Sequence, residues 1–519
     1  MRKNVKQQLA LRVLSTAALM AMVSSIATAA FADTYDLNKG SVDILAEDGK
    51  QYITQWENES KGTYATDDKG EIKKRPDDDI ILTTKNKDTG ETKTTSNTVT
   101  IDAKEDNTAN VTLQDVHIET ERSWDNSGSA PIEIKGDGDT NLELNGNNTV
   151  LSGSSKHAGI EKADVNGTGT LTIKDDLNDN GKEKSGTDAT GTLVAGGCYS
   201  GAGIGGGDGG TCKNIRIEGD AHVTAYAYDS GAIGSGYEPS GDSDITITDH
   251  ATVEAASVEG SGIGQGINAS GKATITISGH ASVHAETFDY RAAIGSGSSS
   301  ATVNIEDHAD VTAVSTGIAI GTGYGHDSDE YQEGTSTVIN ITGGTVNAVT
   351  RGKESKPAIG TVKGNLDVTI NSSTGKTTVN TYTTGSDPLS LNIGTGHYDS
   401  SSRKYSTSPS EGAEYNEDGS SNLGEDNAAI INSYCNTPLG TDTYDAPKTL
   451  DDYAFRATYE AYGALYNAKH TLSDKDKGDL TKVVHNRKYM DESPSIDTSD
   501  LKDEDLHDWK LVGKVVEPT

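Results

Sequence analysis

Short alternations of apolar and polar residues recur through the middle of the chain. One set has the pattern Ile-polar-Ile or a close variant, at Ile215–Ile217, Ile245–Ile247, Ile275–Ile277, Val303–Ile305 and Ile339–Ile341. A second set has the pattern Val-polar-Ala, at Val223–Ala225, Val253–Ala255, Val283–Ala285, Val311–Ala313 and Val346–Ala348. Because successive side chains of a strand point to opposite faces, these segments predict short strands with one buried face.

A third, glycine-rich segment completes each repeat. It contains Ile-Gly, with the isoleucine at positions 204, 233, 263, 294 and 320, so that the spacings are 29, 30, 31 and 26 residues. Three strands in a repeat of about thirty residues predict one rung of a parallel β-helix, whose rungs stack about 4.8 Å apart. Since parallel crossovers are right-handed, we expect an all-β, right-handed parallel β-helix with a small helical C-terminal region.

Changes in composition divide the chain into five regions. Residues 1–32 have a basic start, an apolar run from Val13 to Ala30 and the small-residue site Ala30-Phe31-Ala32, which together predict a secretory signal peptide. Residues 33–95 are polar and irregular and are expected to cap the first rung. The β-helix is predicted over residues 96–398, followed by a polar linker at 399–445 and a helical segment at 446–519.

The C-terminal segment has helical signals. Thr449 and Asp452 resemble a capping box, and Phe455, Tyr459, Tyr462 and Tyr466 follow at helical spacing. A second helical stretch is expected near Leu480 to Tyr489. We expect the aromatic stripe to pack on the end of the solenoid and cover its last rung; binding of a ligand is the alternative.

Charge and composition narrow the possible partners. The chain has 79 acidic and 44 basic residues, a formal net charge of −35, which argues against binding of nucleic acid or anionic lipid. Only 32% of the residues are hydrophobic, which suits the narrow core of a solenoid. No stretch after residue 32 approaches the roughly 20 apolar residues of a membrane span, so none is expected.

Three cysteines suit an exported protein that does not depend on disulfides. Cys198 and Cys212 bracket a glycine-rich segment and are expected to pair, which leaves Cys435 over. A zinc site is the weaker interpretation, because the sequence has no CxxC spacing.

Residues 98–173 carry further alternating segments: Thr98–Ala103, Val111–Leu113, Val116–Ile118, Ser129–Ile134, Leu144–Thr149 and Ala158–Ile160. This part resembles the bacterial secreted carbohydrate-binding domain family with a pectate-lyase-like right-handed β-helix. The Gly-Ile-Gly-Gly-Gly repeats resemble those of large bacterial surface proteins, and the two resemblances together cover roughly residues 98–365. The resemblance implies a non-catalytic protein that binds acidic plant polysaccharide and holds calcium.

One local motif suggests a metal site. Asp176-Leu177-Asn178-Asp179-Asn180-Gly181 matches the first half of a D-x-N-x-N-G calcium loop, whose alternate oxygen ligands suit a hard cation. The twelfth position is Thr187 rather than Glu, so Glu183 and Asp188 are the candidates for the remaining ligands. An acidic turn without a metal is the alternative.

Two columns of side chains are expected on successive rungs. On the second strand of the rungs, Tyr226, Glu254, His284 and Glu286 would share one exposed sheet, a combination of carboxylates and an aromatic ring that suits sugar recognition. Scattered surface polarity is the simpler alternative. His250, His280 and His308 would stack at one turn, as identical side chains do in solenoids, and a metal site there is the less favoured interpretation.

Catalysis is not expected. A polysaccharide lyase of this fold would need a carboxylate-bound calcium and an Arg or Lys base. Arg216 is the one outward basic residue on the aligned strands, and no carboxylate trio adjoins it in the sequence. The sequence therefore predicts a secreted or cell-surface β-helix that binds polysaccharide without cleaving it, with a structural surface or adhesin stalk that binds a protein partner as the alternative.

Overall fold

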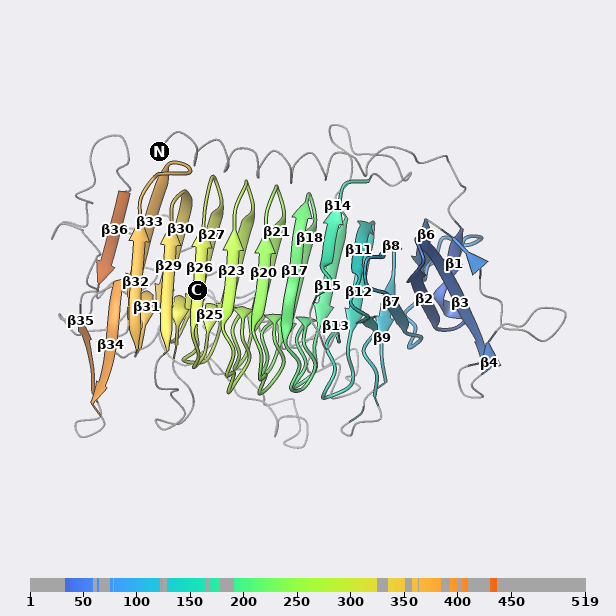
Figure 1. Cartoon of the computed structure of the whole chain (residues 1–519), viewed down its shortest axis with the longest axis horizontal. Coiled ribbons are helices and arrows are strands. Elements are labelled where there is room, and N and C mark those ends of the chain that lie inside the picture. The colour runs from blue at the N-terminus through green and yellow to red at the C-terminus, as the bar shows by residue number, and fades with distance from the viewer. Residues whose placement is uncertain are drawn as a thin grey trace, which may run out of the picture.

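The chain forms an all-β, right-handed parallel β-helix in which three sheets enclose one narrow core (Figure 1). This computed structural model describes residues 33–58, 63–64, 75–77, 79–121, 123, 128–163, 168–177, 191–323, 335–350, 357–362, 364–383, 393–399, 404–408 and 430–435. From β8 (Thr108–Gln114) to β34 (Ile393–Asp399), each rung contributes one strand to each sheet in the order sheet 1, sheet 3, sheet 2, as in β17 (Cys212–Gly219), β18 (His222–Ala227) and β19 (Ile233–Gly234). The predicted fold class is therefore confirmed for the described residues.

Sheet 1 holds the Ile-polar-Ile strands. Its strands, in spatial order, are β1 (Thr34–Asp36), β6 (Ile80–Thr83), β8 (Thr108–Gln114), β11 (Asp139–Asn145), β14 (Leu171–Asp175), β17 (Cys212–Gly219), β20 (Ser243–Ile247), β23 (Ala273–Ile277), β26 (Ala301–Ile305), β29 (Ser336–Ile341) and β32 (Asn365–Ile370).

Sheet 2 holds the Ile-Gly strands, which are short. Its strands are β35 (Lys404–Ser408), β34 (Ile393–Asp399), β31 (Ile359–Thr361), β28 (Ile320–Thr322), β25 (Ile294–Ser296), β22 (Ile263–Gly264), β19 (Ile233–Gly234), β16 (Ile204–Gly205), β13 (Ile160–Lys162), β10 (Ile132–Lys135), β7 (Val99–Ala103), β2 (Val42–Glu47), β3 (Lys50–Asn58) and β4 (Thr63–Tyr64), with β5 (Arg75–Pro76) paired to β3.

Sheet 3 holds the Val-polar-Ala strands. Its strands are β36 (Ile430–Cys435), β33 (Thr377–Thr383), β30 (Gly344–Thr350), β27 (Asp310–Ser315), β24 (Ser282–Thr287), β21 (Thr252–Ser257), β18 (His222–Ala227), β15 (Thr192–Gly196), β12 (Asn147–Leu151) and β9 (His117–Glu119).

The core consists of ladders of aligned aliphatic side chains. In sheet 1 the register aligns Ile215, Ile245, Ile275, Val303 and Ile339, and in sheet 3 it aligns Val223, Val253, Val283, Val311 and Val346. All of these side chains are buried in one continuous cluster. The two ladders predicted from the alternating pattern are confirmed.

The glycines of sheet 2 are required by the close approach of neighbouring rungs. Gly264, for example, has φ +135°, and a Cβ there would lie 1.9 Å from the carbonyl oxygen of Gly295. Only a residue without a side chain fits this backbone conformation and this separation.

The N-terminal cap is more regular than the sequence indicated. Strands β1 and β2 pair in parallel with β6 and β7, so residues 34–47 already extend sheets 1 and 2. The antiparallel strands β3, β4 and β5 then end sheet 2, and the 3-10 helix η1 (Leu37–Lys39) lies between β1 and β2. Antiparallel pairing ends the parallel stack, which protects a sheet edge.

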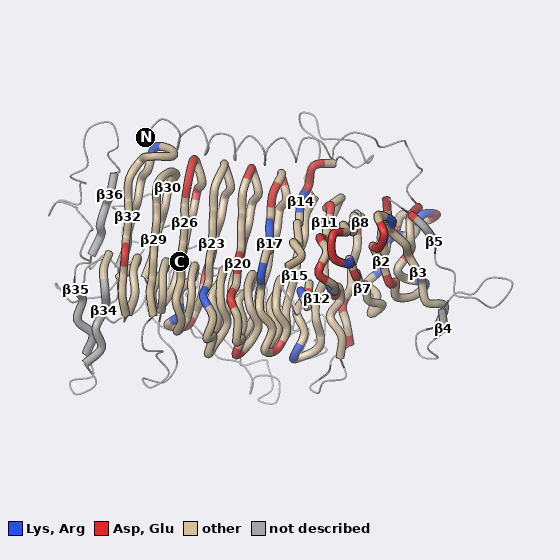
Figure 2. The backbone as a smooth tube through the Cα atoms, viewed as in Figure 1, with Lys and Arg blue, Asp and Glu red and all other residues tan. Residues whose placement is uncertain are grey.

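The other end of the described chain also departs from the prediction. The polar linker predicted at 399–445 contains β35, which pairs antiparallel with β34, and β36, which extends sheet 3. The predicted signal peptide and the helical segment at 446–519 lie outside the described residues. Among the helices of the described part, none is long and apolar enough to cross a membrane. Figure 2 shows that Asp and Glu recur along the described chain, whereas the strands of the middle rungs are mostly uncharged.

Candidate functional site

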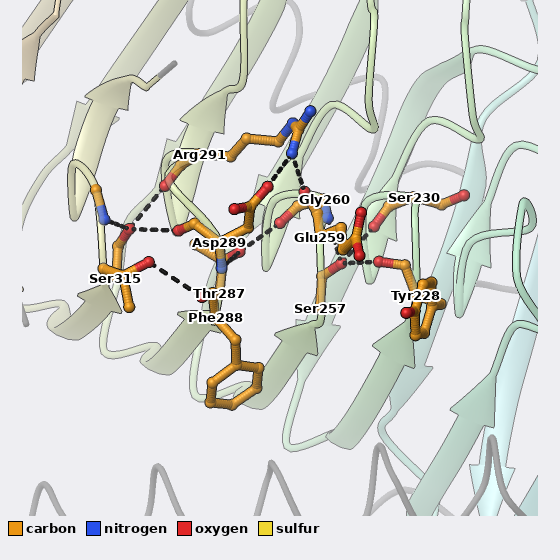
Figure 3. Close-up of polar contacts among 12 residues, drawn as sticks. Tyr228, Ser230, Ser257, Glu259, Gly260, Thr287, Phe288, Asp289, Arg291 and Ser315 are labelled. Carbon is orange, nitrogen blue, oxygen red and sulfur yellow. Dashed lines mark hydrogen bonds and ion pairs between the residues drawn. The ribbon is translucent and has the colours of Figure 1, made fainter. Parts of the chain in front are cut away.

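The corner between sheets 3 and 2 carries aromatic and acidic residues on successive rungs (Figure 3). Tyr228, Val258 and Phe288 directly follow the aligned ends of β18, β21 and β24. A carboxylate follows each of them, at Asp229, Glu259 and Asp289. We call this region, with Tyr199 before it and Tyr290 after it, the aromatic corner.

Two tyrosines of the aromatic corner are exposed. Tyr199 stacks on Tyr228, with ring centroids 5.4 Å apart and ring planes 9° apart. Tyr199 is 39% exposed and Tyr290 is 46% exposed, the two large exposed apolar side chains of the described residues. They follow β15 and β24, which are three strands apart in sheet 3, a separation of about 14 Å along the solenoid axis.

A ladder of hydroxyl groups fixes the loops of the aromatic corner. The Ser257 hydroxyl donates to the carbonyl oxygens of Tyr228 (3.1 Å) and Ser230 (2.7 Å). The aligned Ser315 hydroxyl lies 2.7 Å from the carbonyl oxygen of Arg291, to which it donates. Each buried hydroxyl therefore ties the loop of the preceding rung to the next strand, which holds the corner in one conformation.

Arg291 crosses the interior of the aromatic corner. Its side chain is fully buried, forms an ion pair with Asp289 and donates from Nη1 to the carbonyl oxygen of Glu259 at 2.8 Å. Its Nε and Nη2 atoms have no hydrogen-bond partner among the described residues. The ion pair offsets part of the cost of burying the guanidinium group and joins the loops after β21 and β24.

The environment keeps two tyrosines protonated, Tyr228 in the aromatic corner and Tyr237 shortly after β19. Burial, followed by the negative charges of Glu259 and Asp229, raises the pKa of Tyr228 far above its usual range. Burial and a hydrogen bond with Glu238 raise the pKa of Tyr237 to about 12. Neutral phenols next to carboxylates provide both donors and acceptors for sugar hydroxyl groups, and the exposed ring faces provide apolar contact.

The predicted calcium loop is described only in its first two residues. Asp176 has its carboxylate 2.5 Å from Lys174 Nζ, and its amide donates to Glu143 Oε1 at 2.9 Å. Asn178, Asn180, Glu183 and Asp188 lie outside the described residues. Within the part of the chain that the structure describes, no group of three His, Cys, Asp or Glu side chains could hold a metal ion. The calcium site stays a prediction.

The predicted carbohydrate-binding residues lie on one face of sheet 3, but that face is not exposed as expected. The register aligns Tyr226, Ala256 and Glu286, and it also aligns Glu254 with His284. Tyr226 and His284 are 5% and 7% exposed, Glu286 is fully buried, and Glu254 is half-buried. Apolar neighbours contribute to this burial, because Tyr226 packs with Ala256, Leu151 and Val194. The role in sugar binding stays a prediction.

The histidine column is confirmed as a stack. The His250 and His280 rings are 5.2 Å apart, and the His280 and His308 rings are 4.8 Å apart, both nearly parallel. All three residues are exposed. Arg216, the basic residue considered for a lyase, forms an ion pair with Glu218.

Cys198 and Cys212 are both buried, and no bond joins their sulfur atoms in the structure. Cys212 belongs to the core cluster, whereas Cys198 is buried outside it. The expected disulfide stays a prediction for the exported protein. Mass spectrometry of the non-reduced protein tests it directly.

Sequence reasoning did not identify the aromatic corner. The aligned position after sheet 3 is Tyr228, Val258 and Phe288 in three successive rungs, and a carboxylate follows each one. This repeated pair of a large side chain and a carboxylate was visible in the sequence. It lies in turns, however, and the alternating pattern that identified the strands does not extend into the turns. No family model, curated protein or solved structure matches the chain.

Proposed function

We propose that this chain is a secreted, non-catalytic β-helix that binds carbohydrate through the aromatic corner. The observation that carries the proposal is the exposed Tyr199 ring, held by its stack on Tyr228 beside the carboxylates of the following turns. Aromatic faces combined with a few polar groups are typical of small-molecule and sugar sites. The separation of Tyr199 and Tyr290 along the solenoid axis suits an extended glycan that contacts several rungs.

The charge of the chain limits which glycan it can bind. With a formal net charge of −35, the protein repels a polyanion at low ionic strength. An acidic polysaccharide would therefore need calcium to bridge carboxylates on both sides, with Asp176 in the candidate loop, whereas a neutral glycan would bind without a metal. The resemblance to a carbohydrate-binding family favours calcium-bridged binding of an acidic polysaccharide. The carboxylates of the aromatic corner favour a neutral glycan.

A glycan array probed with and without EDTA tests the proposal. Binding to a neutral glycan that persists in EDTA would assign a metal-independent site, and binding to acidic glycans that disappears in EDTA would assign a calcium bridge. No retention of any glycan under either condition would contradict carbohydrate binding. That result would instead favour a structural stalk, which the long uninterrupted stack of rungs supports (Figure 1).

A further inference from the structure

Carboxylates of the aromatic corner lie beside its stacked tyrosines. The backbone amide of Asp229 donates to the carbonyl oxygen of Tyr199 at 2.9 Å. One rung further along, the amide of Glu259 donates to the carbonyl oxygen of Tyr228 at 2.7 Å. Each of these acidic residues is therefore held directly beside a tyrosine of the preceding rung.

A turn from the other end of the sheet 2 strands adds a third tyrosine and a further carboxylate. Tyr237, which follows β19, donates from its amide to the carbonyl oxygen of Ser200 at 3.0 Å, next to Tyr199 in the chain. Glu238 is exposed, and its Oε1 atom accepts a hydrogen bond from Asn268 Nδ2 at 3.2 Å. Tyrosines and carboxylates from two different corners of the solenoid thus meet around Tyr199.

The negative charges act on the tyrosine side chains as well as on their backbone. Burial, followed by the charges of Glu259 and Asp229, raises the pKa of Tyr228. Burial, followed by a hydrogen bond with Glu238 and its charge, raises the pKa of Tyr237 to about 12, and the charge of Asp229 adds to this rise. Neutral aromatic rings in a negative potential are the surroundings that an organic cation prefers.

The basic residues of this region do not balance that charge, because each of them already faces a carboxylate. The turns concerned join sheet 3 to sheet 2 between residues 152 and 293 of the described chain. Their basic residues and the partners of these are Arg291 with Asp289, Lys156 with Asp208, and His157 with Glu161. The charges of Asp229 and Glu259 therefore give the aromatic corner an excess of negative charge.

We infer that the aromatic corner binds a glycan that carries protonated amino groups, such as a polymer of glucosamine. This inference rests on the proposed carbohydrate binding and narrows its ligand class. An ammonium group over the exposed Tyr199 ring gains a cation–π attraction, and the charges of Asp229 and Glu259 attract the same group. The formal net charge of −35, which repels a polyanion, attracts a polycation from a distance.

The separation of the exposed rings indicates a polymer rather than a single sugar. Tyr199 and Tyr290 lie about 14 Å apart along the solenoid axis, so a small organic cation contacts only one of them. Along a polymer, binding of one amino group holds the next amino group close to the protein, so the attractions reinforce one another. A chain that follows the corner across several rungs therefore binds more tightly than its single sugar.

Calorimetric titration of the wild-type protein with two hexasaccharides tests the inference. The glucosamine hexamer has free amino groups, whereas in the N-acetylglucosamine hexamer the same groups are acetylated and uncharged. We expect the free hexamer to bind at least about tenfold more tightly at pH 5.5 and low salt, and the difference to shrink in high salt, which screens exposed charges. Equal affinity for the two hexamers, or failure of both to bind, would overturn the inference. Neither result would contradict the proposed function, which fails only if the array retains no glycan.

A charge-removing variant locates the attraction. Glu259→Gln keeps the size of the side chain, and Glu306→Gln, in the turn after β26, is the matched control with the same change in net charge. We expect Glu259→Gln to weaken binding of the free hexamer about threefold or more without lowering the melting temperature, and the control to leave binding unchanged. Equal weakening in both variants would assign the attraction to net charge and contradict a site at the corner. The wild-type comparison of the two hexamers stands whether or not Glu259→Gln folds.

Two further probes separate a glycan site from a general attraction for cations. A hexalysine peptide that binds the wild-type protein as tightly as the free hexamer would assign the corner to any polycation and overturn the inference. The second probe replaces Tyr199 by phenylalanine and then by phenylalanines with increasing numbers of fluorine atoms, which withdraw negative charge from the ring face. We expect the affinity for the free hexamer to fall with each added fluorine, whereas a constant affinity across the series would contradict the contact with Tyr199.

Discussion

Tyr199 and Tyr228 lie on successive rungs and stack with their ring centroids 5.4 Å apart and their planes 9° from parallel. Tyr228 is buried, whereas 39% of the Tyr199 surface remains exposed. The inner ring therefore supports the outer one, which fixes the orientation of an aromatic face at the surface without a contribution from a bound ligand. Preorganisation of this kind lowers the entropy cost of binding.

The core ladders predict a large effect of a buried charge. Ile275 is fully buried between Ile245 and Val303, so Ile275→Asp would bury a carboxylate without a partner. We expect the free energy of unfolding to fall by about 3 kcal/mol or more. The neighbouring Thr276→Asp, on the half-buried outer face, should cost no more than about 0.5 kcal/mol. Urea unfolding measures both, and equal stability of the two variants would contradict the ladder.

The glycine of each Ile-Gly strand should be intolerant of a side chain. Gly264→Ala places a Cβ 1.9 Å from the Gly295 carbonyl oxygen at φ +135°, so the strands of two rungs must separate. We expect the free energy of unfolding of Gly264→Ala to fall by about 1–3 kcal/mol. Gly209 also has a positive φ, +72°, but a Cβ there would meet no atom within 4 Å. Gly209→Ala therefore isolates the cost of the backbone conformation and should lower the free energy of unfolding by less than Gly264→Ala. Thermal melting compares the two variants.

Glu143 makes stability depend on pH. Burial, followed by the hydrogen bond with Asp176, raises the pKa of Glu143 from 4.5 to about 8. The folded protein therefore keeps a proton that the unfolded chain releases, so the stabilisation is complete below pH 4.5 and is lost as the pH rises to about 8. Each unit by which the folded-state pKa differs from the unfolded-state pKa corresponds to about 1.4 kcal/mol in the free energy of unfolding.

Urea unfolding between pH 5 and pH 8.5 tests the role of Glu143. Glu143→Gln should remove most of the decline in stability with rising pH, because the amide has no proton to lose. Glu306→Gln, which alters a half-buried glutamate in the turn after β26, is the matched control and should keep the wild-type slope. The pKa of Asp176 is lowered, so its contribution to the free energy of unfolding is lost only as the pH falls through the acidic range. Asp176 therefore does not obscure the change between pH 5 and pH 8.5. An unchanged slope in Glu143→Gln would show that another group controls the decline.

Much of the fold followed from period-two alternation, because that pattern depends only on which side of a strand faces the core. It placed Ile275 and Val283 in their ladders, and the same repeat predicted the stack of His250 on His280. Alternation does not reveal what lies against the other side of a strand. The outward position of Glu286 was therefore expected to be exposed, although apolar Val314 and Val349 in the same column indicated a covered face.

The aromatic corner was harder to predict for a different physical reason. Its side chains lie in turns, where contacts between rungs rather than strand periodicity decide their positions. The stack of Tyr199 on Tyr228 joins two turns of different sequence, Cys198-Tyr199-Ser200 and Tyr228-Asp229-Ser230. The buried ion pair of Arg291 with Asp289 likewise has no repeat in the neighbouring rungs that would draw attention to it.

Calorimetric titration of the best glycan from the array into four proteins tests the central claim most directly. The first is the wild type, and the second is the double variant Tyr199→Ala with Tyr290→Ala. The third is its matched control, Tyr199→Phe with Tyr290→Phe. The fourth is His280→Ala, in the turn before β24 and so at the other end of the sheet 3 strands. We expect the alanine double variant to bind at least about tenfold more weakly, because removal of a stacking ring costs roughly 1–1.5 kcal/mol or more. The phenylalanine and histidine variants should stay within about threefold of the wild type. Wild-type affinity in the alanine double variant would contradict glycan binding at the aromatic corner.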